Sequence, residues 1–349
     1  MPEAASGYAF RRAARLLLVC SAMVCGTAPA AWAAGGSVWI AATGNFQIAE
    51  ILPNQLKHSG QPAEAVNESA AITGEPLGIC FDKKKNLWVT DFSEQVLEFT
   101  SAQLKRLKAS SNSPAPAVTI TSTSFNDING CNFDSAGNLW LVDQDSPSVD
   151  EISKTQLKAG GSITPAKIIS DSAEFDFPTF LAFDKSGNLW VTNEHGSPMG
   201  TGSSSLLAFS PSQQASGGTQ TAAVKISSGS LNAPGELAFD NHGNLWVTNF
   251  GGETVVMFAK KDLGTSGSPT PAVTLSSAAF NGPWGLAFQN GNSGPLWILN
   301  NDDGMLNEFV PSQIMSSGSP TPKVSLSNTS SDAYQITFGP VDGKAGDTN

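Results

Sequence analysis

The stretch FDKSGNLWVTN, residues 183–193, decides the fold because it returns along the chain. Close copies are FDKKKNLWVTD at 81–91, FDSAGNLWLVD at 133–143 and FDNHGNLWVTN at 239–249, and a degenerate copy, FQNGNSGPLWILN, occupies 288–300. The tryptophans of these copies, preceded by Trp39 in SVWIAAT, recur at intervals of 49 to 56 residues. Six copies of one tryptophan-containing segment indicate a repeat protein.

Each repeat contains four short apolar runs separated by turn residues. In one repeat these runs are FLAFD at 180–184, NLWVTN at 188–193, LLAFS at 206–210 and AAVKIS at 222–227. Four strands in about 50 residues match one blade of a β-propeller. No segment keeps the 3.6-residue apolar period of a helix over about 11 residues. The sequence therefore predicts an all-β, six-bladed β-propeller of four-stranded antiparallel blades.

The two ends of the chain predict how the ring closes. The first repeat begins at its second strand, SVWIAA, and YQITFGP at 334–340 starts a seventh copy that stops after one strand. We therefore expect the C-terminal strand to become the innermost strand of the blade built from residues 37–73, which leaves no sheet edge at the seam.

A turn of the form Asp-x-x-Gly-Asn follows the first strand of most repeats, as is ordinary for hairpins. In the copy that contains Lys83, Lys84 and Lys85 the glycine is absent, which predicts a looser turn.

The first 33 residues have the three parts of a secretory signal peptide. Arg11, Arg12 and Arg15 precede the apolar run 16–25, and small residues at 31 and 33 suit cleavage after Ala33, with cleavage after Ala30 as the alternative. The apolar run is shorter than the ~20 residues of a membrane span. We expect an exported protein, periplasmic or extracellular, with one propeller domain over 34–349, no membrane span and a monomeric state.

The charges are unevenly distributed. The formal net charge is −11, which disfavours nucleic-acid partners because their negatively charged phosphates bind to positively charged protein surfaces. In a propeller, the loops from outermost to innermost strands and from second to third strands share one face. We call this face the acidic face, because its loops and the strand ends beside them contain no Lys or Arg. Its acidic residues are Glu68, Glu75, Asp91, Glu94, Asp127, Asp143, Asp145, Asp171, Glu174, Asp176, Glu194, Glu253, Asp302, Asp303 and Asp332.

This face can attract cations or a basic partner, or it can serve solubility alone. A long loop on it, which begins at Glu194 and His195, is a candidate binding loop together with Asp302 and Asp303. Oxygen ligands suit calcium or magnesium, and a chain with only three histidines, His58, His195 and His242, is poorly supplied for zinc. The candidate ligands are Glu236, Glu75, Asp127, Asp91, Asp143, Asn193, Asn249 and Asn300. Glu236 is preferred, because it replaces a small residue on an innermost strand.

Two cysteines, Cys80 and Cys131, remain after cleavage of the signal peptide, and both fall on innermost strands of adjacent blades. Counted from the phenylalanine that ends each strand, they are one step out of register, so they should point to opposite faces of their blades. The sequence leaves a bridge open and favours buried free thiols.

The repeat phrase resembles the NHL repeat, most clearly in residues 283–288 and 240–249. The resemblance covers nearly the whole mature chain and implies a six-bladed propeller. The wider superfamily contains gluconolactonase-like (SMP-30) hydrolases and virginiamycin B lyase-like enzymes. The favoured function is that of a binding or scaffold protein, which recognises a protein, carbohydrate or small-molecule ligand on the acidic face around the channel. The alternative is a divalent-metal-dependent hydrolase or lyase at the channel mouth.

Overall fold

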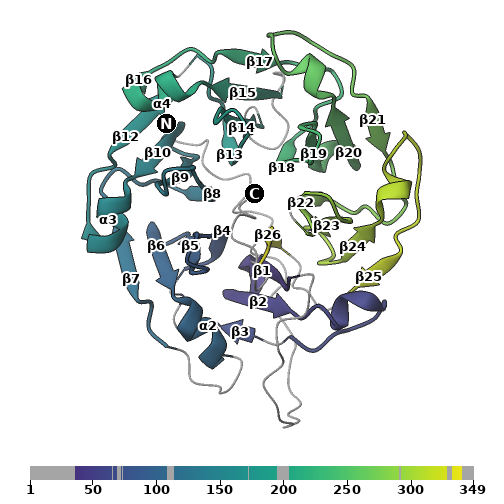
Figure 1. Cartoon of the computed structure of the whole chain (residues 1–349), viewed down its shortest axis with the longest axis horizontal. Coiled ribbons are helices and arrows are strands. Elements are labelled where there is room, and N and C mark those ends of the chain that lie inside the picture. Colours follow the sequence, from purple (N-terminus) through teal and green to yellow (C-terminus); the bar gives the residue numbers. More distant parts are fainter. Residues whose placement is uncertain are drawn as a thin grey trace, which may run out of the picture.

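Six β-sheets surround a central axis and follow one another around the ring in sequence order (Figure 1). The computed structural model describes residues 36–64, 66–68, 72, 74–107, 114–171, 173–194, 204–290, 292–327 and 332–339. The predicted six-bladed β-propeller is confirmed. The predicted signal peptide, residues 1–33, lies outside the described residues, and so does His195.

Each blade has four antiparallel strands, written here from the innermost strand outward. Blade 1 contains β26 (Ala333–Phe338), β1 (Val38–Ala42), β2 (Gln47–Ile51) and β3 (Val66–Glu68). Blade 2 contains β4 (Pro76–Phe81), β5 (Leu87–Asp91), β6 (Gln95–Phe99) and β7 (Val118–Thr121). Blade 3 contains β8 (Ile128–Phe133), β9 (Leu139–Asp143), β10 (Ser148–Ile152) and β12 (Lys167–Ser170).

The second half of the ring repeats this arrangement. Blade 4 contains β13 (Pro178–Phe183), β14 (Leu189–Asn193), β15 (Ser205–Phe209) and β17 (Val224–Ile226). Blade 5 contains β18 (Pro234–Phe239), β19 (Leu245–Asn249), β20 (Thr254–Phe258) and β21 (Val273–Leu275). Blade 6 contains β22 (Pro283–Phe288), β23 (Leu296–Asn300), β24 (Leu306–Phe309) and β25 (Val324–Leu326).

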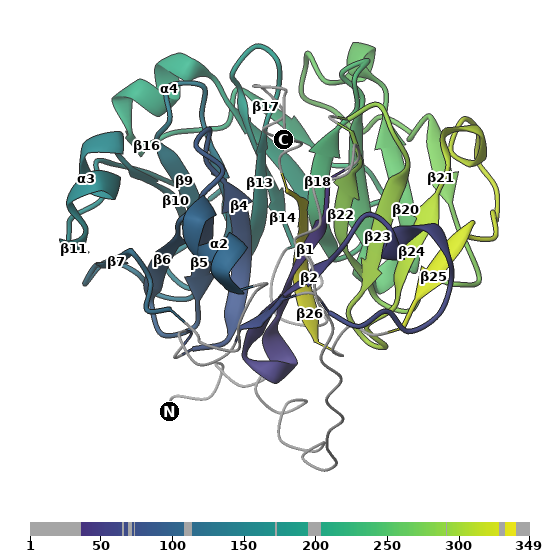
Figure 2. The same cartoon turned by 60° about the horizontal axis from the view of Figure 1, so that its bottom comes forward.

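The C-terminal strand β26 closes the ring as predicted. It pairs antiparallel with β1, with Val38 opposite Phe338 and Ile40 opposite Ile336. Figure 2 shows β26 lying beside β1 at the front of the ring. The edge of β1 is therefore paired, although these strands lie at opposite ends of the chain.

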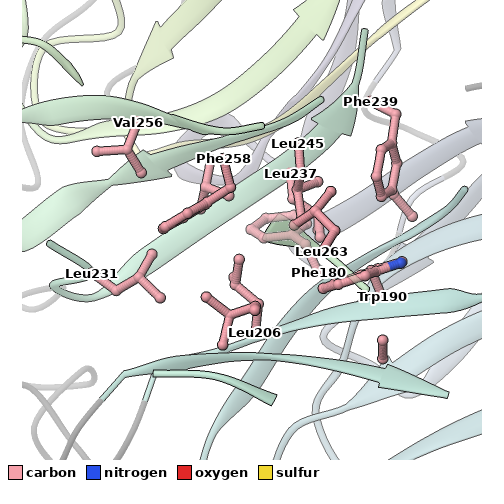
Figure 3. Close-up of a cluster of buried hydrophobic side chains, with 14 of the residues drawn as sticks. Phe180, Trp190, Leu206, Leu231, Leu237, Phe239, Leu245, Val256, Phe258 and Leu263 are labelled. Carbon is pink, nitrogen blue, oxygen red and sulfur yellow. The ribbon is translucent and has the colours of Figure 1, made fainter. Parts of the chain in front are cut away.

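The repeated tryptophans pack between neighbouring blades. Trp190 of blade 4 meets Phe239 of blade 5 edge to face, with ring centroids 6.1 Å apart (Figure 3). The same pairing joins Trp88 to Phe133. Such edge-to-face contacts between large buried rings stabilise each blade interface, which explains why the repeat contains a tryptophan and a phenylalanine at fixed positions.

The aspartate of the repeat accepts hydrogen bonds from the tryptophan and from the asparagine of the hairpin turn. In blade 4, the indole Nε1–H of Trp190 and the side-chain amide of Asn188 both donate to Asp184 Oδ2, at 3.3 and 2.7 Å. The same pair of bonds occurs on Asp134 and Asp240. One carboxylate therefore satisfies a buried indole and fixes the hairpin.

The turn at Lys85 is not looser than the others, contrary to the prediction. Lys85 adopts φ 67°, where the equivalent Gly187 has φ 82°. The backbone N–H of Lys85 donates to Asp82 O at 2.9 Å, as Gly187 does to Asp184 O at 3.0 Å. The hydrogen bonds of Asp82 hold the lysine in the left-handed region, which costs about 1–2 kcal/mol for a residue with a Cβ atom.

Short helices follow the third strand of blades 2, 3 and 4 and were not expected from the sequence. They are α2 (Ser101–Leu107), α3 (Lys154–Ala159) and α4 (Pro211–Ser216), on the rim of the ring (Figure 1). In α3 and α4 a capping box begins the helix, with Ser153 and Gln156 in one and Ser210 and Gln213 in the other. Helices of one or two turns are too short to produce an apolar period in the sequence. Among the described residues, none of the helices has the length and apolarity needed to cross a bilayer.

The segments after α3 and α4 reach the outermost strand of the preceding blade. The short strands β11 (Gly161–Ser162) and β16 (Gly218–Thr219) pair in parallel with β7 and β12. Isolated parallel bridges at Gly60, Gly267 and Gly318 repeat the contact at three further junctions. This parallel outer pairing, which the sequence analysis missed, links blade to blade around the rim.

Cys80 and Cys131 form a disulfide, with their Cα atoms 6.0 Å apart, so the expectation of free thiols is wrong. The predicted difference in register is confirmed. Cys80 pairs across its blade with the repeat tryptophan Trp88, whereas Cys131 pairs with Leu141, the residue after the equivalent Trp140. Neighbouring blades pack face to face, so side chains on opposite faces point toward each other across the interface. The mismatch therefore brings the two sulfurs together.

Candidate functional site: the acidic face and the central channel

The last residue of the second strand anchors the neighbouring loop in blades 2 to 6. All five of these side chains were predicted as metal ligands, and all five are buried: Asp91, Asp143, Asn193, Asn249 and Asn300. In blade 4, Asn193 accepts from Asp176 N at 2.7 Å and donates to Glu174 O at 2.9 Å. Asn249 and Asn300 donate to Ser230 O and Ala279 O at 2.7 and 2.8 Å. These residues hold the loops of the acidic face in place.

Carboxyl groups gather on the acidic face between blades 2 and 3. Asp143 accepts hydrogen bonds from Asn126 N and Ser146 N, each at 3.0 Å. Burial, together with the charges of Asp150 and Glu94, raises the pKa of Asp143 to about 8, although those two hydrogen bonds lower it. Burial also raises the pKa of Asp91 to about 6.

Glu94 connects the two blades in this group. Its Oε1 accepts from the backbone N–H of Asp127 at 2.8 Å, and Asp127 holds the left-handed conformation at φ 64°. Burial and the charge of Asp145 raise the pKa of Glu94. Asp91 Oδ2 and Glu94 Oε2 are buried and accept no hydrogen bond within the part of the chain that the structure describes. Sequence analysis selected Asp91, Asp127 and Asp143 as candidate metal ligands and counted Glu94 only among the acidic residues of this face.

The other predicted residues are dispersed. Glu75 is half-buried just before β4. Asp302 and Asp303 are exposed in the turn after β23, where Asp303 accepts from Met305 N at 2.9 Å. Glu194 lies at the start of the long loop, and burial raises its pKa to about 7. His58 and His242 are exposed in loops.

Two phenylalanines stand out on the acidic face. Phe46 follows the second strand of blade 1 and is 47% exposed, and Phe92 follows that of blade 2 and is 50% exposed. Phe92 directly follows Asp91 in the sequence, and Glu94 lies two residues further on. The sequence analysis missed both, because a single exposed aromatic in a loop has no signal apart from its neighbours.

An aromatic cluster fills the channel at the level of the second and third residues of the innermost strands. Trp284 of blade 6 meets Tyr334 of blade 1 and Phe180 of blade 4, with ring centroids 5.5 and 5.9 Å apart. Phe250, from the loop after β19, packs on Trp284 at 5.4 Å, and Leu77 belongs to the same cluster. Blade 5 contributes Gly235 at this level, where a Cβ atom would lie 2.8 Å from Trp284 O.

Glu236 lies beyond this cluster, in a pocket on the side where the innermost strands end. Gln335 and Thr337 from β26, Leu286 from β22, and Ile79 from β4 also line the pocket, as does the disulfide. Glu236 Oε2 accepts from Leu286 N at 2.6 Å, and Oε1 accepts from Gln335 Nε2 at 2.9 Å. Burial raises the pKa of Glu236 to about 8, while these N–H donors and Ile336 N lower it.

The structure therefore separates the preferred ligand from the other candidates. Glu236 is inside the channel, whereas Asp91, Asp127 and Asp143 belong to the acidic face. Within the described ranges, no group of three or more His, Cys, Asp or Glu side chains is arranged to hold a metal ion. The calcium or magnesium site stays a prediction.

No family model matches the sequence, and the curated proteins contain no match. Solved structures do resemble it. A protein of unknown function from Bacteroides caccae is 12% identical, with a TM-score of 0.57 over 86% of this chain and 98% of that one. Virginiamycin B lyase from Staphylococcus aureus is 13% identical, with a TM-score of 0.53 over 89% and 82%. A catalytically inactive histidine-to-alanine variant of that lyase, with quinupristin, is 13% identical, with a TM-score of 0.51 over 90% and 87%. At these identities the likeness establishes the fold alone: the chain is a β-propeller related in structure to virginiamycin B lyase-like proteins.

Proposed function

We propose that the protein is an exported, NHL-like binding protein whose acidic face recognises a basic, partly apolar segment of a partner protein. One observation carries the proposal: the exposed Phe92 is flanked by Asp91 and Glu94 on a face whose described loops contain no Lys or Arg. A face of this kind offers both an apolar contact and negative charge to the same ligand.

The electrostatics of the junction between blades 2 and 3 favour a cationic ligand. The carboxyl groups of Asp143, Asp91 and Glu94 are held with raised pKa values because they are buried near one another. A Lys or Arg side chain placed among them would relieve that repulsion and would donate hydrogen bonds to Asp91 Oδ2 and Glu94 Oε2. A face of one sign also accelerates the encounter with an oppositely charged partner.

The exposed rings add specificity. Phe46 and Phe92 come from equivalent loops of neighbouring blades, so both belong to the same face of the ring. An aromatic face attracts an ammonium or guanidinium group by about 0.5–1 kcal/mol at an exposed site, and its apolar surface can bind the stem of a long basic side chain.

The positions of the histidines favour a binding function over a lyase activity. A histidine is required in the lyase that resembles this chain, as its inactive variant indicates. The two histidines in the described part of this chain, His58 and His242, are exposed in loops and do not line the channel pocket. The alternative of a metal-dependent hydrolase needs a ligand group that the described residues do not form.

A peptide titration tests the proposal. The probe is a short peptide that alternates lysine with leucine, and the control probe is the same peptide with every lysine acetylated. We expect the mature protein to bind only the first, and we expect Phe92→Ser and Asp145→Asn each to weaken binding about threefold or more. Met315→Ser is the matched control, because Met315 is 80% exposed and lies outside the acidic face.

Equal binding of both peptides, or binding that added salt does not weaken, would overturn the proposal. A saturable calcium or magnesium isotherm that is lost in Asp91→Asn, with no peptide binding, would instead make the face a metal site.

A further inference from the structure

The channel pocket contains a single charged side chain whose hydrogen-bond partners are all donors. Glu236 is 6% exposed and is the only titratable group among the described residues that line the pocket, since Cys80 and Cys131 are joined. Gln335 cannot turn its amide around, because its Oε1 accepts from Ile79 N at 2.7 Å. Its Nε2 must therefore face Glu236, and the site is built for a carboxylate.

Burial opposes that charge. Without a counter-charge, burial raises the pKa of Glu236 to about 8. The three groups that hydrogen-bond to Glu236, Leu286 N, Ile336 N and Gln335 Nε2, are all donors, so they stabilise the carboxylate and not the protonated carboxyl. A positive charge in the pocket removes this conflict, because it stabilises the carboxylate without competing for those donors.

The backbone of the innermost strands supplies further ligands for a cation. In a β-strand the N–H and C=O of one residue point to the same edge. The N–H groups of Ile79 and Leu286 point into the channel, since they bind the side chains of Gln335 and Glu236. Their carbonyl oxygens therefore point into the channel as well, from blades 2 and 6. Carbonyl oxygens around an axis are suitable ligands for a monovalent cation.

We propose that this pocket binds one small monovalent cation, with Glu236 as its counter-ion and backbone carbonyls of the innermost strands as its other ligands. One carboxylate balances one positive charge, whereas a divalent ion would need further anionic ligands that the described residues do not bring together here. The site is independent of the acidic face, from which the aromatic cluster of Trp284, Phe180 and Tyr334 separates it.

Thermal unfolding of the mature protein in different chloride salts tests the site. The probes are ammonium, sodium and potassium chloride, and the reference at equal concentration is tetramethylammonium chloride, whose cation is too bulky for the pocket. We expect at least one small cation to raise the melting temperature saturably, on the order of 3 °C at ten times its dissociation constant. The most effective salt then identifies the ion as ammonium or an alkali metal.

Three variants decide whether Glu236 is responsible. Glu236→Gln should abolish the difference between the small cations and tetramethylammonium. The exchange Glu236→Gln with Gln335→Glu keeps one carboxylate and one amide in the pocket and should restore at least part of the effect. Asp150→Asn is the control for loss of a buried carboxyl, since Asp150 is 1% exposed and does not line the pocket, and it should leave the effect unchanged. Equal stabilisation by all four salts, or an effect that persists in Glu236→Gln, would overturn the proposal.

Discussion

The side-chain carbonyl of Gln335 accepts a hydrogen bond from the backbone N–H of Ile79 at 2.7 Å, across 256 residues of sequence. Gln335 belongs to the closing strand of blade 1, and Ile79 belongs to the innermost strand of blade 2. Through Glu236 and Leu286 the same hydrogen-bonded chain reaches blades 5 and 6. The seam of the ring is therefore held by polar contacts inside the channel as well as by strand pairing.

Removal of residues 333–349 should destabilise the whole protein, because it exposes the edge of β1 and removes the buried side chain of Ile336. The single change Ile336→Ala should lower the free energy of unfolding by about 2–5 kcal/mol. Denaturant unfolding of the exported chain measures both. A truncated protein that melts within about a degree of the full chain would contradict the closure of the ring.

Reduction of the disulfide should also destabilise the protein, by about 2–4 kcal/mol, because the bond closes a long loop between blades 2 and 3. The melting temperature with and without a reductant measures the effect, and the double variant Cys80→Ala/Cys131→Ala should not respond to the reductant. Alkylation of two thiols in the unreduced, denatured protein would show that the bond is absent.

Raising the pH should lower stability through the carboxyl groups of the acidic face. Burial raises the folded-state pKa of Asp143 to about 8 and that of Asp91 to about 6, above the value of about 3.9 expected in the unfolded chain. Between about pH 4 and these values the folded state binds more protons than the unfolded state. The free energy of unfolding therefore falls as pH rises, by at most about 1.4 kcal/mol per pH unit for each group.

A matched pair of variants checks this pH dependence. Asp143→Asn should flatten the pH dependence, whereas Asn193→Asp, at the equivalent position of the next blade, should make it steeper. Chemical denaturation from pH 4 to pH 9 measures both slopes. Identical slopes in the wild type and Asp143→Asn would show that Asp143 does not titrate in this range.

Lys85→Gly should stabilise the protein by about 1 kcal/mol, because glycine adopts the observed φ of 67° without the cost that a Cβ atom imposes. Gly137→Ala is the reverse test at the equivalent turn of blade 3. It should destabilise by a similar amount, since only Cδ of the Lys154 side chain lies near the added methyl group, at 3.9 Å. If both changes leave the midpoint of urea unfolding in place, the turns do not hold the left-handed conformation.

The spacing of Trp88, Trp140 and Trp190 was sufficient to predict the number of blades, because one bulky residue must recur wherever two blades pack. The pairing of Cys80 with Cys131 was missed because the position of a cysteine within its own strand does not show which faces of two neighbouring blades pack against each other. Glu236 was recognised as unusual on its strand. Its separation from the acidic face could not be predicted, because that separation depends on Phe180, Trp284 and Tyr334, which meet only when distant blades close around the axis. The roles of Asn193 and Asn249 were missed for a related reason: their partners lie in loops whose backbone path the sequence does not specify.

The parallel outer pairing makes the order in which the blades unfold under mechanical load depend on their direction around the ring. The short strands β11 and β16 each cover the outermost strand of the blade before them, and the bridge from Gly60 to Leu326 continues this order across the seam. If one blade is pulled open, the outermost strand of the blade before it loses its parallel partner, whereas the outermost strand of the blade after it keeps its partner. Forced unfolding should therefore spread from the blade that opens first toward the N-terminus along the chain.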